Sequence, residues 1–358
     1  MNVKMKLFGY VLMLALPLAI LCSSCEEPVD LTADYKDITV SYAFLNVQDD
    51  IHYFKVYRGY LTDDNAYVEA SKWENIYYPV DSIEVVLEEY NQQKLMRSEK
   101  LDTTTQVARD AGYFTNPKQL LYYSKWKLNP EYTYKLVIKN VNTGRTVYAE
   151  TNIVGEFSVR RPTSNWNMNL DQPYSVQFYD ADNAAAYDVY LSFYYIEMDN
   201  KTGKIEHKVL TKKLNASLIR AISTAGYITF SKFVPNTFYS FLVQSIPENK
   251  NVTRYIDAID GKPYNCLRLE VWAANEQFLT YQQVASPTSS IVQNRMEYTN
   301  FVSEDNSAYG LLASRSSCFK DLKLDNSQGH NEDTLVLGSK TRNLNFDYYR
   351  NSPEFLGE

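Results

Sequence analysis

The sequence predicts an all-β protein built from two β-sandwich domains in tandem. Three observations predict this fold class: short runs of alternating apolar and polar residues, polar breaks rich in Asp, Asn and Gly between them, and a local motif that occurs twice. Tyrosine content supports it, because 31 of the 358 residues are tyrosine and this residue favours strands. Tyrosine also offers a stacking surface with a hydroxyl, so a sugar- or peptide-binding face stays open.

The first domain is expected at residues 33–154. Its clearest strand is Ser82 to Glu88, where β-branched and apolar residues alternate with polar ones. Further strands are expected at Ile38 to Leu45, Ile51 to Tyr60, Leu121 to Leu128 and Arg145 to Asn152.

A proline–tyrosine motif occurs at Leu128 to Ile138 and again at Phe233 to Val243. In each copy an apolar residue precedes the proline by two positions, and a tyrosine, Tyr134 or Tyr239, follows it by four. Proline cannot donate to a central strand ladder, so we place it in the turn before a strand. The motif resembles the tyrosine corner of immunoglobulin-like and fibronectin-III domains, in which the tyrosine hydroxyl bonds to backbone. We therefore predict structural tyrosine corners at Tyr134 and Tyr239, one in each sandwich.

The second domain is expected at residues 155–342, as a fibronectin-III-like sandwich with one or two short helices and a C-terminal extension. Its strands are expected at Tyr174 to Tyr179, Tyr187 to Met198, Ile205 to Lys212 and Tyr264 to Ala274. Helices are expected at Asn215 to Ser223, with Asn215 as N-cap, and at Glu276 to Ala285.

Residues beyond about 290 fit neither sandwich simply. Met296 to Val302 and Ala308 to Ser314 are expected to be strands that complete the second domain. Asn326 to Asp333 is expected to be a loop, and residues 343–358 a loosely held tail.

The first 24 residues have the layout of a lipoprotein signal peptide. Lys4 and Lys6 precede an apolar run from Leu7 to Leu21, and small residues then lead to Cys25. The run of about fifteen residues is shorter than the roughly twenty that span a bilayer. We expect residues 1–24 to be removed and Cys25 to be acylated, which attaches the chain to outer-membrane lipid.

Residues 25–32 form an acidic tether that contains Glu26, Glu27 and Asp30. The tether resembles the export signal of Bacteroidetes-type lipoproteins. That resemblance implies a lipid-anchored protein of the outer membrane that is exposed at the cell surface, with the periplasmic leaflet as the alternative.

The charge excludes one class of partner. The chain has a formal net charge of -7 and no basic cluster, whereas nucleic-acid phosphates demand patches of Lys and Arg. We therefore expect no nucleic-acid partner.

Two cysteines, Cys266 and Cys318, lie beyond the leader. Disulfides persist in exported proteins, so a bond between these two residues is open, with buried free thiols as the alternative.

The sequence offers no recognisable chemistry. The three histidines, His52, His207 and His330, show no metal-ligand spacing, and no nucleophile elbow or phosphate loop occurs. The run Asp180 to Asn183 opens like a calcium loop, but Ala185 stands where such a loop needs glycine, and we predict a β-turn. We predict no catalytic, cofactor-binding or metal-binding residue and no cofactor.

Several blocks of the chain resemble a family of Bacteroidetes-type outer-membrane lipoproteins of unknown function, commonly encoded beside TonB-dependent receptors. Besides the leader, the blocks are Pro79 to Leu87, Ala111 to Phe114, Leu128 to Ile138, Glu297 to Asn300 and Tyr309 to Ser314. The resemblance implies a receptor-associated accessory protein and carries no catalytic residues to transfer. We therefore expect a non-enzymatic binding or accessory module for a TonB-dependent β-barrel receptor, and the tyrosine content leaves a glycan or peptide open as its ligand. Two alternatives stay open: a fimbrial or adhesin-type structural subunit, and a glycan hydrolase or esterase without a sequence motif.

Overall fold

The computed structural model of the chain describes residues 37–60, 65–110, 116–163, 167–168, 174–221, 226–233, 236–285, 298–324 and 330–357. Strand accounts for 45% of these described residues and helix for 18%, and the strands form several sheets, so the described part of the protein is mostly β, as predicted. The predicted leader, Cys25 and the acidic residues Glu26, Glu27 and Asp30 lie outside the described residues.

The first half of the molecule contains two sheets that face each other. One is an antiparallel sheet of β4 (Lys94–Lys100), β3 (Ile83–Asn91), β7 (Thr133–Asn140) and β8 (Thr146–Asn152). The other contains β1 (Thr39–Leu45), β2 (His52–Arg58), β6 (Leu121–Ser124) and β5 (Asp102–Thr104). Because strand side chains alternate between faces, every second residue points inward, for example Val85 and Leu87 opposite Phe54. These inward side chains form one cluster, here called the first core. Two short helices, α2 (Ala66–Glu69) and α3 (Trp73–Ile76), follow β2.

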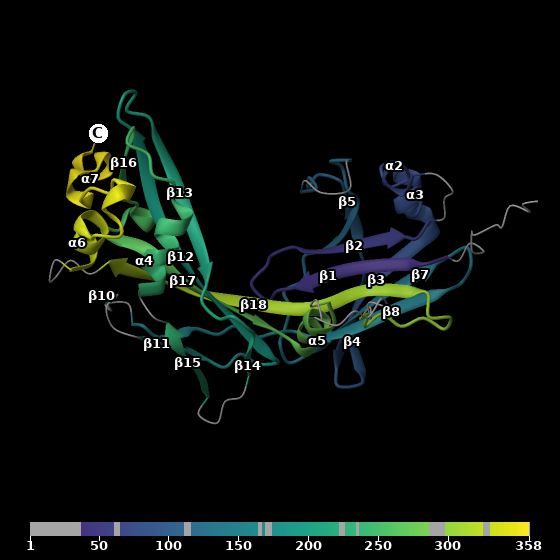
Figure 1. Ribbon diagram of the computed structural model, residues 1–358. Helices are drawn as coiled ribbons and strands as arrows, with labels where there is room; N and C mark the ends of the chain where they lie inside the picture. Colours follow the sequence, from purple (N-terminus) through teal and green to yellow (C-terminus); the bar gives the residue numbers. More distant parts are fainter. Residues whose placement is uncertain are drawn as a thin grey trace, which may run out of the picture.

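The second half continues the large sheet through β13 (Ile205–Lys213), β12 (Ala186–Asp199) and β17 (Asn265–Ala274). The short strands β14 (Ile219–Arg220) and β16 (Val252–Ile256) also pair with β12. A separate sheet of β15 (Tyr227–Phe233), β11 (Tyr174–Tyr179) and β9 (Val159–Arg161) contributes apolar residues to the same cluster as β12 and β17, here called the second core. Helices α4 (Asn236–Ser245), α6 (His330–Leu337) and α7 (Pro353–Leu356) lie beside this core (Figure 1).

One long strand, β18 (Ala308–Leu324), belongs to both halves (Figure 1). Its first part, Ala308 to Ser314, pairs in parallel with β1, and the rest pairs antiparallel with β17. Leu312 is buried in the first core and Leu322 in the second. The expectation that Ala308 to Ser314 completes the second domain is therefore wrong: this segment completes the first half. The position of this segment is fixed by its pairing with β1, which is distant in sequence. The alternation of apolar and polar residues within the segment does not reveal that partner.

Three other local predictions are wrong for related reasons. Asn215 caps no helix, because its side-chain oxygen accepts a hydrogen bond from the Val189 backbone N–H at 2.7 Å and a short strand, β14, follows. Of the strand predicted at Met296 to Val302, the first two residues lie outside the described residues; in the rest Phe301 is buried in the first core, and Val302 forms an isolated bridge with Tyr148 instead of a strand. Of the loop predicted at Asn326 to Asp333, residues 326–329 lie outside the described residues, and His330 to Asp333 belong to α6 instead.

The tail from residue 343 is not loosely held. Leu344, Phe346 and Tyr349 are buried in the second core. The buried guanidinium of Arg254 donates a hydrogen bond to the Leu344 carbonyl at 2.6 Å and pairs with Glu197 at 2.9 Å. The tail thereby covers a charged group that would be costly to bury without partners.

Candidate functional site

The predicted tyrosine corners have different outcomes. The Tyr134 side chain is fully buried at the start of β7, and its hydroxyl accepts a hydrogen bond from the Asn129 backbone N–H at 2.9 Å. The same hydroxyl donates to the Glu89 carboxylate at 2.5 Å, so it ties the turn to β3. Tyr239 lies in helix α4, so the strand expected there does not form and Tyr239 is not a tyrosine corner.

Cys266 and Cys318 are both free thiols, so no disulfide joins them. Their strands pair in a register that places Val271, not Cys266, opposite Cys318. The five-residue offset corresponds to about 16 Å along the strand, whereas bonded cysteines need Cα atoms within about 7 Å. Burial raises the pKa of both thiols, that of Cys318 to about 12, so both stay protonated.

A groove lies on the outer face of the large sheet, beneath helix α5 (Glu276–Ala285). Two cavities of about 390 and 210 Å³ share Leu218 and Gln282 as lining residues, and together they are here called the α5 groove. Strand alternation places its floor: Tyr187 and Val189 of β12 point into the second core, and Asp188 and Tyr190 point the other way.

Aromatic rings line one end of the α5 groove. Trp272 of β17, Tyr190 of β12 and Phe278 of α5 are among its lining residues. Phe278 meets Phe44 of β1 edge to face, with 5.4 Å between ring centroids. The groove therefore lies at the junction of the two halves of the molecule, a common place for ligand sites.

The lining of the α5 groove is positively charged. Asp188 is the one acid among the lining residues given for the two cavities, and it is engaged by Lys213 at 2.7 Å and by the Asn215 amide at 2.8 Å. Arg220 and Arg315 form no salt bridge with any described carboxylate. The Arg315 guanidinium instead lies over the Trp272 ring, 4.9 Å from its centroid. Two guanidinium groups that pair with none of the described carboxylates give this groove a chemistry suited to an anionic ligand.

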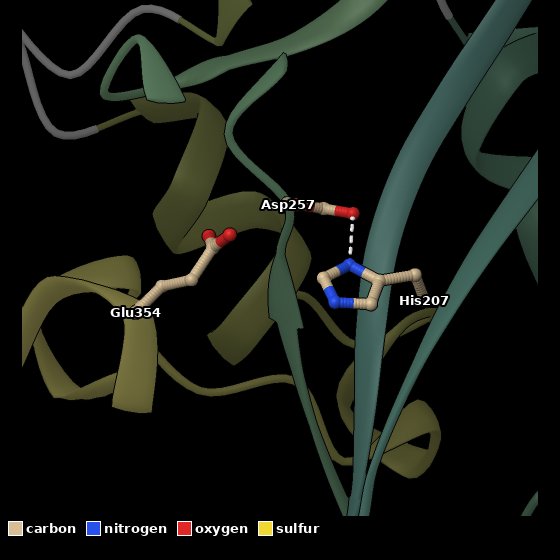
Figure 2. A group of neighbouring side chains, drawn as sticks. All are labelled: His207, Asp257 and Glu354. Atoms are coloured by element: carbon tan, nitrogen blue, oxygen red, sulfur yellow. Dashed lines mark hydrogen bonds and ion pairs between the residues drawn. The ribbon is translucent and has the colours of Figure 1, made fainter. Parts of the chain in front are cut away.

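A second cluster lies at the far end of the second half, where β13, the segment after β16, and α7 meet. His207 Nδ1 and Asp257 Oδ2 are 2.9 Å apart, and Glu354 reaches toward them from α7 (Figure 2). The hydrogen bond to Asp257 raises the pKa of His207. Partial burial and the charge of Asp257 raise the pKa of Glu354. Donor atoms of the three side chains lie within 4.8 Å of one another, so this cluster is the candidate metal centre.

Sequence reasoning did not find either site. Helix α5 was predicted with its observed bounds, but nothing local indicated that it covers Trp272 and Tyr190. His207 and Glu354 are far apart in sequence, and the metal motifs sought depend on close spacing. The predicted β-turn after Asp180 is confirmed by a hydrogen bond from the Ala184 N–H to the Ala181 carbonyl at 3.1 Å.

The fold and groove define a mostly β protein with a ligand-sized cleft between two halves. No family model matches the chain, and no curated protein matches it. The C-terminal globular domain of an oligosaccharyltransferase from Pyrococcus abyssi is similar over 61% of this chain and 43% of that chain, at 12% identity and a TM-score of 0.23. The chain thus spans less than half of that structure, and a similarity this weak carries no argument. None of the described helices is both long and apolar enough to cross a membrane.

Proposed function

We propose that this protein is a lipid-anchored, surface-exposed binding module that holds an acidic oligosaccharide in the α5 groove and serves a TonB-dependent β-barrel transporter. The observation that carries the ligand is the α5 groove, where aromatic rings and two guanidinium groups without salt bridges to described residues line one cleft. Aromatic faces stack on the apolar faces of sugar rings, and guanidinium groups pair with carboxylates. The glutamines Gln282 and Gln283 add hydrogen-bonding groups for hydroxyls.

The anchoring part of the proposal rests on the leader sequence. Lys4, Lys6 and the apolar run before Cys25 favour acylation at that cysteine, and Glu26 and Glu27 favour export to the surface. The chain with Cys25→Ala should lose incorporation of a labelled fatty acid and leave the membrane fraction. Labelling that persists in this variant would contradict the anchor.

A glycan array that includes uronic-acid and neutral oligosaccharides tests the ligand. We expect binding to acidic glycans, weakened at least tenfold by Arg315→Gln, because a charge-assisted hydrogen bond contributes about 1.5–3 kcal/mol. Arg97→Gln is the matched control, since Arg97 also lies over a tryptophan, Trp126 at 3.9 Å, but in the first half and outside the groove. Binding to neutral glycans alone, or to acidic peptides alone, would overturn the proposed ligand.

Co-purification tests the proposed partner. The protein solubilised from native membranes should be recovered with a β-barrel receptor, and the yield of this complex should not depend on Arg315. Recovery without any β-barrel protein would contradict the accessory role and leave the glycan test independent of it.

We further propose that the first half is an immunoglobulin-like sandwich and the second half a fibronectin-III-like one. Two facing sheets with one core between them, and the hydrogen bond from the Asn129 N–H to the Tyr134 hydroxyl, support the first assignment. The sheet of β15, β11 and β9, which shares the second core with β12 and β17, supports the second.

The structural-subunit alternative requires an edge strand that accepts a strand from another copy. The end strand of the large sheet, β13, carries Lys208, Lys212 and Lys213. Lysines on an edge strand hinder pairing with a second chain, so strand exchange is disfavoured at the β13 edge of the sheet.

A further inference from the structure

The residues of the His207–Asp257–Glu354 cluster come from β13, from the segment after β16, and from α7 (Figure 2). None of them lines the α5 groove, and along β13 His207 is six residues, about 20 Å, from the groove residue Lys213. We propose that these three side chains bind a first-row divalent metal ion, with Zn²⁺ as the probe. The proposal is independent of the ligand in the α5 groove.

The donor set fits such an ion. One imidazole nitrogen and two carboxylates are the ligand types that zinc accepts, and three protein ligands leave one coordination position for water. Ca²⁺ and Mg²⁺ prefer oxygen ligands only, and in larger number than this cluster supplies.

The backbone positions the ligands before any ion arrives. Asp257 is held by a hydrogen bond from its N–H to the Tyr194 carbonyl at 3.0 Å. Glu354 lies in α7, whose N-cap Ser352 is buried and accepts a hydrogen bond from the Phe355 N–H. The anchored backbone of both acids lowers the conformational entropy lost on metal binding.

Among the described residues, the two carboxylates of the cluster have one cationic partner, His207, which pairs with Asp257. Within the described part of the chain, no lysine or arginine forms a salt bridge with Asp257 or Glu354, and His207 is the sole cationic partner recorded for Asp257. Carboxylate oxygens of Asp257 and Glu354 lie within 4.8 Å of each other, and two carboxylates this close repel each other when both are ionised. A divalent cation between them removes that repulsion and joins α7 to the edge strand β13.

Calorimetric titration of the untagged, chelator-treated full chain in detergent tests the site. We expect one equivalent of Zn²⁺ to bind, and Mg²⁺ and Ca²⁺ to bind at least tenfold more weakly. Glu354→Gln and His207→Ala should each weaken Zn²⁺ binding at least tenfold. Glu304→Gln is the matched control, an exposed glutamate in the loop before β18, and should bind as the parent does.

Hydrogen exchange supplies a second readout that does not depend on heat of binding. Zn²⁺ should slow exchange of the amides in α7 in the parent chain and in Glu304→Gln, but not in Glu354→Gln. The proposal is overturned if the parent binds no Zn²⁺ stoichiometrically, or if His207→Ala and Glu354→Gln bind it as tightly as the parent.

Discussion

The segments 128–138 and 233–243 share a proline–tyrosine motif, but the first leads into strand β7 and the second into helix α4. In β7 the buried residues are Tyr134, Leu136 and Ile138, at a spacing of two. In and just after α4 they are Phe238, Tyr239, Leu242 and Ile246, which recur at the three- and four-residue spacing of one helix face. The same proline and tyrosine positions are thus compatible with either element.

The difference shows that the period of the residues beyond the motif decides the element. Lys135 and Lys139 lie on the other face of β7, because their charged side chains are costly to bury in a core. In this segment only the spacing of two, typical of a strand, buries the apolar residues and leaves these lysines outside the core. The second copy contains both periods, because Tyr239, Phe241 and Val243 also alternate. This second segment forms a helix because the helical spacing lets Phe238 pack edge to face on Phe193 of β12, with 5.7 Å between ring centroids.

The largest loss of stability is expected for a substitution at Gly310, in strand β18, which belongs to both halves of the molecule. A Cβ atom at this position would lie 1.8 Å from the Ser41 carbonyl oxygen, and the φ angle is +125°. Gly310→Ala should therefore cost about 4 kcal/mol or more, since the clash is with backbone that cannot move aside. Chemical denaturation should show the first core unfolding before the second.

Gly203→Ala is the control for Gly310→Ala. Gly203 also has a positive φ, of +68°, but nothing lies within 4 Å of its Cβ position. The expected cost is about 1 kcal/mol, from backbone strain alone. Equal costs for the two variants would contradict the shared role of β18.

A smaller effect is expected from removal of the Tyr134 hydroxyl. Tyr134→Phe leaves the Asn129 N–H and the Glu89 carboxylate without this partner, so we expect a loss of about 1–3 kcal/mol in unfolding free energy. Tyr122→Phe is the matched control in the same core, because the buried Tyr122 hydroxyl has no hydrogen-bond partner among the described residues. That variant should be neutral or slightly more stable in urea denaturation.

The buried Tyr122 phenol also predicts that the protein loses folding stability at high pH. Burial raises the pKa of Tyr122 to about 12. The fold therefore favours the neutral phenol, and its contribution is complete below pH 10 and is lost as the pH rises toward 12. At pH 11 the parent should lose about 1 kcal/mol that Tyr122→Phe retains. Denaturation curves at pH 8 and pH 11 measure this difference, and an equal loss in both proteins would contradict it.

Local sequence pattern predicted much of the strand content but not the pairing between distant segments. Tyr174 to Tyr179 and Glu276 to Ala285 form as predicted, because their own residues set their period. The double role of β18 depends on its register with β1, and that information is not local. The candidate sites were missed for the same reason: Trp272 meets Arg315, and His207 meets Glu354, only after the sheets have formed.

The smallest expected effect comes from replacing one valine by alanine in each copy of the motif. This pair of substitutions tests directly whether each copy is a strand or a helix, because the change in stability should have opposite signs in the two copies. Val137 is half-buried in β7, and Val243 is 41% exposed in α4. Val137→Ala should lower stability by about 0.5–1 kcal/mol, since alanine is disfavoured in strands. Val243→Ala should raise it by about 0.5 kcal/mol, since alanine is the better helix former. Hydrogen exchange of the amides in β7 and α4 measures both changes locally, because it reports the free energy of opening of each element. A loss of protection in α4 on Val243→Ala would mean that the second copy of the motif is a strand after all.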